Sequence, residues 1–289
     1  MALASYDAKI IHAATFREHV MNKYKYLALI GLATASLFAT QAFAATCPAG
    51  QMGSPVCIST TGGDGANTSL QDILGPSTGT NSLFSSGPGT NVYTQQAQKS
   101  FWSVTGSSGS ISTILLQLTS NANGFTFGIF DPNNASNMLP ILTGGSTGAQ
   151  ATLTTYINGG YAVNYGPIDY FSTTNLFGFY LTTPGGVTFY SVPTLNSDGI
   201  AHMVAYQGDG TSVLAPIGQL SGGLWASNEY ILAWEDALLG GSDLDYQDFI
   251  VMVESVRPVP EPADLGMFGL GLLLIGGFVA IRRRRQYNA

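Results

Sequence analysis

Short apolar runs separated by turn-forming residues dominate the sequence from residue 101 to residue 256. Glycine, proline and asparagine stand between the runs, as in Pro184-Gly185-Gly186 and Asp198-Gly199, and these residues favour turns. No segment of this region has a convincing amphipathic helical pattern. The sequence therefore predicts an all-β fold, an antiparallel β-sandwich of jelly-roll-like type. Strands are expected at residues 114–118, 125–130, 151–157, 176–181, 187–192, 202–206, 230–234 and 249–256.

Composition favours a folded, exported β-protein over a disordered chain. Only 9% of the 289 residues are charged, whereas aromatic residues make up 11%. Disordered chains are usually poor in aromatic and β-branched residues. The mixture of aromatic residues with abundant glycine, serine and threonine therefore suits β-structure outside the cell.

The N-terminal part carries a secretory signal. From Met21 the sequence reads MNKYKYLALIGLATASLFATQAFA, with two lysines, a short apolar stretch and a small-residue cleavage motif. Cleavage is expected between Ala44 and Ala45, which makes residues 1–44 the signal peptide. Residues 1–20 fit no signal pattern, so we expect translation to start at Met21.

The C-terminal part, residues 258–289, combines an apolar segment with a basic end. Residues 263–281 are nearly uncharged and long enough to cross a bilayer as a single transmembrane helix. Four consecutive arginines follow, and the positive-inside rule places them in the cytoplasm and the preceding chain outside. A Pro-Glu-Pro sequence stands before the apolar segment, where its prolines keep the backbone extended.

This tripartite end resembles the PEP-CTERM sorting signal of Gram-negative bacteria. The residues that carry the resemblance are Pro260, Glu261, Pro262, Arg282, Arg283, Arg284 and Arg285. The resemblance implies export by the Sec machinery, anchoring in the inner membrane, and recognition by an exosortase near Pro-Glu-Pro. The protein would then reach the cell surface or the extracellular space. A permanent tail anchor is the alternative interpretation.

The exported part is strongly acidic. Between residues 45 and 264 there are fifteen acidic residues and two basic ones, Lys99 and Arg257, which gives a net charge of −13. Such a surface repels nucleic acid and attracts cations, so we expect no nucleic-acid partner.

Two cysteines follow the cleavage site. In an oxidising compartment, Cys47 and Cys57 are expected to close a small disulfide loop. A lipoprotein anchor at Cys47 is the alternative, although Thr46 suits such processing poorly. Residues 45–100 are then a disulfide loop and a loose Gly/Ser/Thr-rich entry segment with short strands, and residues 101–257 form the sandwich core.

An acidic loop is expected between the last two strands. Its sequence, WEDALLGGSDLDYQD at residues 234–248, holds five carboxylates and no lysine or arginine. Alternate residues of an extended chain share a face, which would bring the two aspartates of Asp-Leu-Asp together. Carboxylates this close repel one another unless a cation lies among them, and hard oxygen ligands favour calcium over zinc or copper. The candidate ligands are Glu235, Asp236, Asp243, Asp245 and Asp248. Solvated turn aspartates are the alternative.

The same region resembles the domain of unknown function 4114 family. The resemblance rests on Glu-Asp at residues 235–236 and on a Gly-rich turn that leads into Asp-Leu-Asp-Tyr-Gln-Asp at residues 243–248. Further similarity lies at residues 127–131, 177–180 and 198–202, so that about residues 66–256 are covered. The resemblance implies an exported β-rich domain with a calcium site and no established chemistry. Gln247 stands where the family carries asparagine, and both side chains offer a carbonyl oxygen.

We expect no catalytic site. His202 lies between apolar neighbours and is expected to be a strand residue with a local hydrogen bond. A glycosidase pair of Glu235 with Asp243 or Asp245 would need one raised pKa, but a solvent-facing acidic loop keeps both groups ionised.

The sequence as a whole predicts a non-catalytic structural or adhesion protein of the cell surface or extracellular matrix, stabilised by calcium. A carbohydrate-binding module of the extracellular polysaccharide is the second interpretation. Trp102, Trp225 and many tyrosines could form a sugar-binding platform, although most aromatic residues are expected in the core. A glycoside hydrolase is the third.

Overall fold

The computed structural model describes residues 55–62, 68–97, 100–105, 110–117, 124–144, 147–172 and 175–259. The expected signal peptide and the apolar segment at residues 263–281 lie outside these ranges. The same holds for Ala44, Ala45, Cys47, Pro260, Glu261, Pro262, Arg282, Arg283, Arg284 and Arg285. Cys57 is described and is disulfide-bonded. Within the described ranges, no helix is long and apolar enough to span a membrane.

Strands make up most of the regular structure of the described residues. They are β1 (Phe84–Ser86), β2 (Phe101–Val104), β3 (Ser110–Gln117), β4 (Thr126–Asp131), β5 (Asn134–Thr143), β6 (Gln150–Tyr156), β7 (Gly160–Val163), β8 (Asp169–Tyr170), β9 (Gly178–Thr182), β10 (Thr188–Tyr190), β11 (Met203–Gln207), β12 (Val213–Leu214), β13 (Gly223–Leu224), β14 (Glu229–Trp234), β15 (Phe249–Glu254) and β16 (Val256–Val259). The helical elements are α2 (Leu70–Leu74) and the 3₁₀ turns η1 (Ile157–Gly159) and η2 (Pro193–Leu195).

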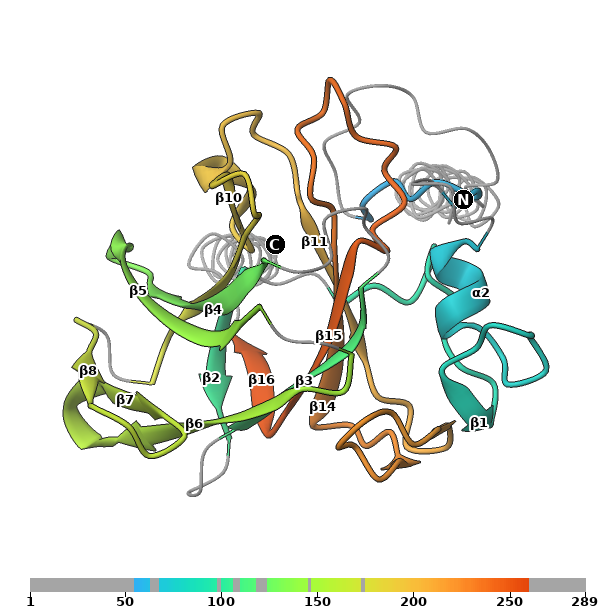
Figure 1. Ribbon diagram of the computed structural model, residues 1–289, viewed down its shortest axis with the longest axis horizontal. Coiled ribbons are helices and arrows are strands. Elements are labelled where there is room, and N and C mark those ends of the chain that lie inside the picture. Colours follow the sequence, from blue (N-terminus) through green and yellow to red (C-terminus); the bar gives the residue numbers. More distant parts are fainter. Residues whose placement is uncertain are drawn as a thin grey trace, which may run out of the picture. The chain divides into compact units, whose positions relative to one another are not determined.

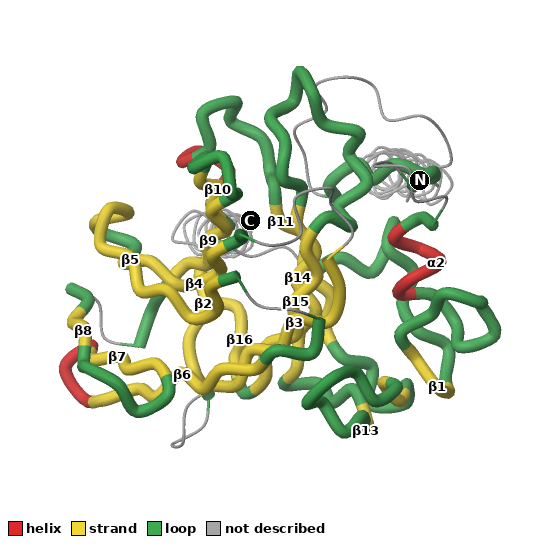
Figure 2. Tube along the Cα trace, in the orientation of Figure 1, coloured by secondary structure: helices red, strands yellow, loops and turns green. Residues whose placement is uncertain are grey.

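Two antiparallel sheets contain most of these strands (Figure 1). The smaller one has the order β10-β9-β4-β5, and the larger one has the order β11-β14-β15-β3-β6-β7-β8. Two minor sheets, β1-β12-β13 and β16-β2, complete the pairings. Figure 2 shows β3, β14 and β15 side by side, with β4, β5, β9 and β10 grouped apart from them. The all-β part of the prediction is therefore confirmed.

Aromatic side chains fill the space between the two main sheets. Phe127 of β4 stacks on Phe179 of β9, with 5.4 Å between the ring centroids. The Phe127 ring also lies 6.0 Å from Phe249 of β15 and meets Trp234 of β14 edge-on at 6.3 Å, both on the opposite sheet. The two sheets thus bury a common apolar layer, as in a β-sandwich.

The larger sheet buries its other face as well. In β14, Leu232 and Trp234 belong to the layer between the sheets, whereas Ile231 and Ala233 join a second apolar cluster. This division follows the two-residue period of a strand, and β15 shows the same alternation. The residues that cover the second face include Leu70, Ile73, Leu74, Phe84 and Trp225.

Residues 68–97 differ from the loose entry segment with short strands that the sequence suggested. They contain α2, whose N-terminus is closed by a capping box: Ser69 Oγ accepts from the Asp72 N–H, and the Asp72 carboxylate accepts from the Ser69 N–H. A helix of five residues is too short to show an amphipathic period. The helix packs against the apolar side chains on the second face of β14 and β15. This contact positions α2, because it removes those side chains from water.

Two further differences concern strands. The single strand expected at residues 249–256 is two strands, because Ser255 adopts a φ of 56° and the chain then leaves the larger sheet to pair as β16 with β2. β5 occupies a segment without an expected strand. It is the edge of the smaller sheet, where polar residues and Pro140 are tolerated and hide the strand pattern.

We expect α2, which covers the second face of the larger sheet, to unfold together with the two main sheets. Leu74→Ala removes a fully buried side chain and should lower the free energy of unfolding by about 2–5 kcal/mol. Leu195→Ala, at an exposed leucine of η2, should change it by less than about 0.5 kcal/mol. Urea unfolding followed by tryptophan fluorescence measures both. Equal changes in the free energy of unfolding for the two variants would show that α2 does not unfold together with the two main sheets.

Candidate functional site

The acidic loop joins two neighbouring strands of the larger sheet. β14 ends at Trp234 and β15 begins at Phe249, and these residues face each other in the antiparallel register. Glu235 and Asp248 therefore leave the sheet side by side. At this base of the loop, the Asp248 carboxylate accepts a hydrogen bond of 2.9 Å from the backbone N–H of Asp236. The sheet pairing thus sets the position of the loop ends.

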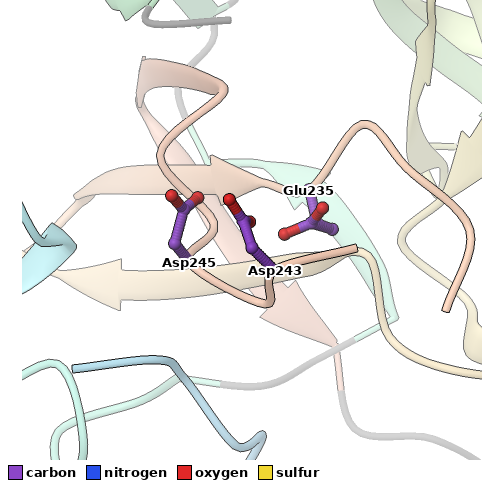
Figure 3. Close-up of side chains that lie close together, drawn as sticks. All are labelled: Glu235, Asp243 and Asp245. Carbon is purple, nitrogen blue, oxygen red and sulfur yellow. The ribbon is translucent and has the colours of Figure 1, made fainter. Parts of the chain in front are cut away.

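All five predicted ligands come together, in two groups that share one residue. One group is Glu235, Asp243 and Asp245, and the other is Glu235, Asp236 and Asp248. In each group, one carboxylate oxygen per residue lies within 4.8 Å of the others. Figure 3 shows the three carboxylates of the first group next to one another, two from the returning half of the loop and one from the end of β14.

Three of the five carboxylates are withdrawn from solvent. Glu235 is 1% exposed, Asp245 is 0% exposed and Asp248 is 2% exposed. Asp236 is half-buried, and Asp243 is exposed. The prediction of a solvent-facing loop is therefore wrong for the three buried residues.

Contacts with other segments fold the loop back onto the domain. The Tyr246 hydroxyl donates to the Ala201 carbonyl at 2.6 Å, and the Ser59 N–H donates to the Leu244 carbonyl at 2.7 Å. The backbone also departs from the extended form assumed in the sequence analysis, because Leu244 has a φ of 59° and Tyr246 a φ of 55°. Left-handed turns, not strand alternation, bring the aspartates together.

Burial and neighbouring charge both act on Glu235. Removal from water raises the pKa of its carboxyl, and the negative charges of Asp243 and Asp245 raise it further, to about 8. Hydrogen bonds from the Ser242 side chain and the Tyr246 backbone oppose this rise in part. Glu235 is thus a carboxyl that holds its proton near neutral pH unless a cation replaces it.

Two buried oxygen atoms of the loop have no hydrogen-bond partner among the described residues. They are Glu235 Oε2 and Gln247 Oε1. The Gln247 side-chain amide donates to Asp245 Oδ2 at 2.6 Å, which places this amide in contact with the carboxylate cluster. Both atoms can act as cation ligands. Gln247 is not among the ligands predicted from the sequence, where its position in the Asp-Leu-Asp-Tyr-Gln-Asp pattern is the only signal for it.

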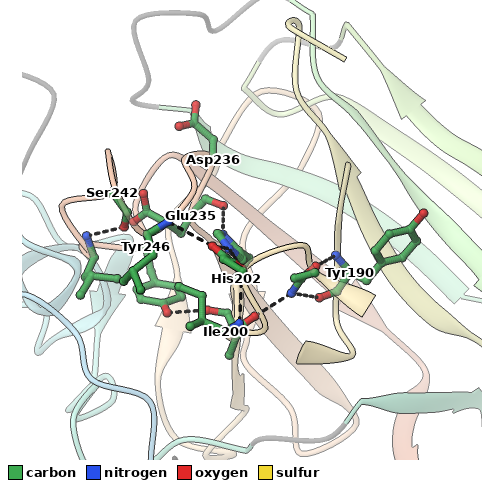
Figure 4. Close-up of polar contacts among 12 residues, drawn as sticks. Tyr190, Ile200, His202, Glu235, Asp236, Ser242 and Tyr246 are labelled. Carbon is green, nitrogen blue, oxygen red and sulfur yellow. Dashed lines mark hydrogen bonds and ion pairs between the residues drawn. The ribbon is translucent and has the colours of Figure 1, made fainter. Parts of the chain in front are cut away.

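A buried histidine holds the rim of the loop (Figure 4). His202 Nε2 lies 3.0 Å from Asp198 Oδ2, and Nδ1 lies 3.2 Å from the carbonyl oxygen of Glu235. The imidazole stacks on Phe189, with 3.9 Å between ring centroids. Asp198 also accepts a hydrogen bond of 3.0 Å from the backbone N–H of Leu239. With both ring nitrogens engaged, His202 has a positioning role. It makes the expected local hydrogen bond, with Asp198, but it lies just before β11 and not within a strand as predicted.

No family model, curated protein or solved structure matches this chain. Its site is therefore interpreted from its own chemistry, and the two family resemblances stay predictions. The cluster offers carboxylate and amide oxygens, and the sequence has no lysine or arginine between Lys99 and Arg257. The Arg257 side chain donates to Ser103 Oγ, on the β2–β16 pair. Protons or a hard cation can neutralise such a cluster.

Glu235 is expected to make stability depend on pH when divalent cations are removed. Its pKa is about 8 in the folded chain and 4.5 in its ordinary state, so its stabilising contribution is full below pH 4.5 and is lost as pH rises to 8. Chemical denaturation in chelator between pH 5 and 8 measures this loss. The slope for Glu235→Gln should be shallower than that of the parent by about 1.4 kcal/mol per pH unit. Identical slopes would show that Glu235 is ionised throughout this range.

Proposed function

We propose that this chain is an exported, non-catalytic protein of the cell surface or extracellular matrix, and that its acidic loop binds calcium. The observation that carries the metal proposal is a pair of buried oxygens without a hydrogen-bond partner among the described residues: Glu235 Oε2, which belongs to the carboxylate cluster, and Gln247 Oε1, whose amide contacts Asp245. A buried polar atom without a partner costs about 1–3 kcal/mol, and the repulsion between carboxylates adds to this cost. A bound cation removes both.

Calcium fits the ligands of this loop better than other common metals. It accepts several carboxylate and carbonyl oxygens in a flexible geometry, whereas magnesium demands a near-ideal octahedron and keeps water ligands. Zinc and copper favour nitrogen and sulfur ligands. The loop offers oxygen ligands, and the nearby His202 has both ring nitrogens engaged.

The position of the loop supports a structural role. Glu235 follows β14 and Asp248 precedes β15, and both strands are buried on their two faces. A cation held by these residues would tie the ends of the central pair together and couple metal binding to folding. We propose a jelly-roll-like sandwich, firm where calcium is present, as a scaffold for adhesion or matrix structure.

Calcium is expected to stabilise the full chain. At a free concentration a hundredfold above Kd, binding contributes about 2.7 kcal/mol and should raise the unfolding temperature by roughly 5–10 °C. Magnesium should give a smaller rise, because it gives up its water ligands reluctantly and demands a near-ideal octahedron. The triple variant Asp243→Asn, Asp245→Asn, Asp248→Asn should lose the calcium effect. Differential scanning calorimetry with calcium, magnesium or chelator measures these shifts.

The triple variant carries a further expectation of opposite sign. In chelator it should unfold at a higher temperature than the parent, because three amides remove like-charge repulsion. Asp169→Asn, at an exposed aspartate of β8, is the matched control and should respond to calcium as the parent does. A parent chain that calcium leaves unchanged would contradict the metal proposal.

The sequence signals at the two ends support export and sorting. We propose passage through the Sec machinery, a transient inner-membrane anchor at residues 263–281, and processing by an exosortase at Pro260-Glu261-Pro262. The high negative charge of the exported part suits an extracellular surface that meets cations and polysaccharide.

Sorting is expected to require the Pro-Glu-Pro motif. In a Gram-negative host with an exosortase, the parent should reach the surface or medium, whereas Pro260→Ala, Pro262→Ala should stay in the inner membrane. Pro258→Ala, just outside the motif, is the control and should behave as the parent. Cell fractionation with immunoblotting measures the distribution. The same inner-membrane pool in hosts with and without the exosortase would indicate a permanent tail anchor.

Carbohydrate binding is the second candidate function, favoured by an exposed cluster around Gly160. Its members Tyr156, Ile168 and Tyr170 are 41%, 40% and 62% exposed. Trp102 and Trp225, by contrast, are fully buried, so only the tyrosines support a sugar platform. Glycan-array binding that persists in chelator would favour this function over the calcium-dependent one.

A glycoside hydrolase is the third candidate. Glu235 has the raised pKa of a general acid, contrary to the prediction that the loop keeps it ionised. Its burial, however, keeps it from a glycosidic oxygen, which a general acid must contact. The non-catalytic role therefore stays the proposal.

A further inference from the structure

The two carboxylate groups of the acidic loop occupy different places. Asp236 and Asp248 lie at the base of the loop, where a backbone N–H of one is bound by the carboxylate of the other. Asp243 and Asp245 lie in the returning half of the loop, beyond the glycine turn. Glu235 is the member common to both groups.

Local contacts with Gln247 hold Asp245 in the second group. Asp245 Oδ1 accepts the Gln247 backbone N–H at 3.1 Å, and Asp245 Oδ2 accepts the Gln247 side-chain amide at 2.6 Å. Gln247 Oε1 is buried and has no hydrogen-bond donor in the described part of the chain. The same holds for Glu235 Oε2 within the described ranges. Each of these oxygens can therefore coordinate a cation.

The charge of the cluster exceeds what one divalent cation neutralises. Once a bound cation has replaced the Glu235 proton, the five carboxylates carry a charge of −5, so one divalent cation leaves −3 and a second leaves −1. Lysine and arginine are absent from residues 100–256, so the neighbouring sequence supplies no such countercharge. Around the three buried carboxylates, the remaining repulsion is weakly screened by salt.

We propose that the loop binds two divalent cations that share the Glu235 carboxylate. One lies between Asp236 and Asp248 at the base, and the other lies between Asp243 and Asp245 in the returning half. This inference rests on the proposed calcium site and adds the number of ions and the division of their ligands. A shared carboxylate couples the two positions, because the first ion orients Glu235 for the second.

The number of bound ions tests the proposal. Calcium titration of the full chain by isothermal calorimetry, with native mass spectrometry as an independent count, should give two ions per chain. The double variants Asp236→Asn, Asp248→Asn and Asp243→Asn, Asp245→Asn should each bind at most one. Glu235→Gln should weaken binding at both positions by at least about tenfold. Asp169→Asn should keep two ions.

The outcomes separate this inference from the proposed function. One ion per chain in the parent overturns the two-ion centre and leaves the calcium site standing, whereas no ion overturns both. A double variant that keeps two ions, or Glu235→Gln with unchanged affinity at both positions, also overturns the shared centre. The count for the parent needs no variant, and near-UV circular dichroism of each variant in chelator confirms that its fold is retained.

Discussion

The pairing of β14 with β15 is the contact on which the core and the acidic loop both depend. Side chains of these strands alternate between the layer facing the smaller sheet and the cluster beneath α2, so the strands are buried on both faces. Because both faces are buried, five consecutive residues of each strand are apolar, as in the sequence Tyr-Ile-Leu-Ala-Trp of β14. The same register sets Trp234 opposite Phe249, and the residues just beyond them, Glu235 and Asp248, become neighbours.

The carboxylates of the loop stay close together because apolar packing of Trp234 and Phe249 fixes the two ends of the loop. Glu235 cannot move away without unpairing Trp234, a fully buried side chain whose removal would cost about 3–5 kcal/mol. Contacts from distant segments then close over the loop, from Ser59 to the Leu244 carbonyl and from Tyr246 to the Ala201 carbonyl. Carboxylates that would be solvated in an open turn are thereby desolvated. A cation bound among them would replace the repulsion between the carboxylates by attraction to the ion, and it would link the ends of β14 and β15.

The rim residues have a supporting part in this arrangement. His202 and Asp198 contact the loop at the Glu235 carbonyl and the Leu239 N–H, so one side-chain pair positions both the start and the middle of the loop. Both ring nitrogens of His202 are engaged, and among the described residues neither His202 nor Asp198 belongs to the two carboxylate groups. The site thus consists of a packed scaffold, a hydrogen-bonded rim and a set of oxygen atoms that face one another.

The sequence by itself determined the strand class, the turns and the composition of the loop, because these depend on local signals: apolar runs of strand length, glycine and proline between them, and five carboxylates without a lysine or arginine. It did not show α2, whose five residues are too few for a helical period, nor β5, which polar residues and Pro140 disguise. Only the tertiary structure decided that Glu235, Asp245 and Asp248 are buried, that Gln247 joins them, and that Glu235 belongs to both groups. Burial and pKa depend on which distant segments cover a residue, and that information lies in long-range packing and not in the spacing of residues along the chain.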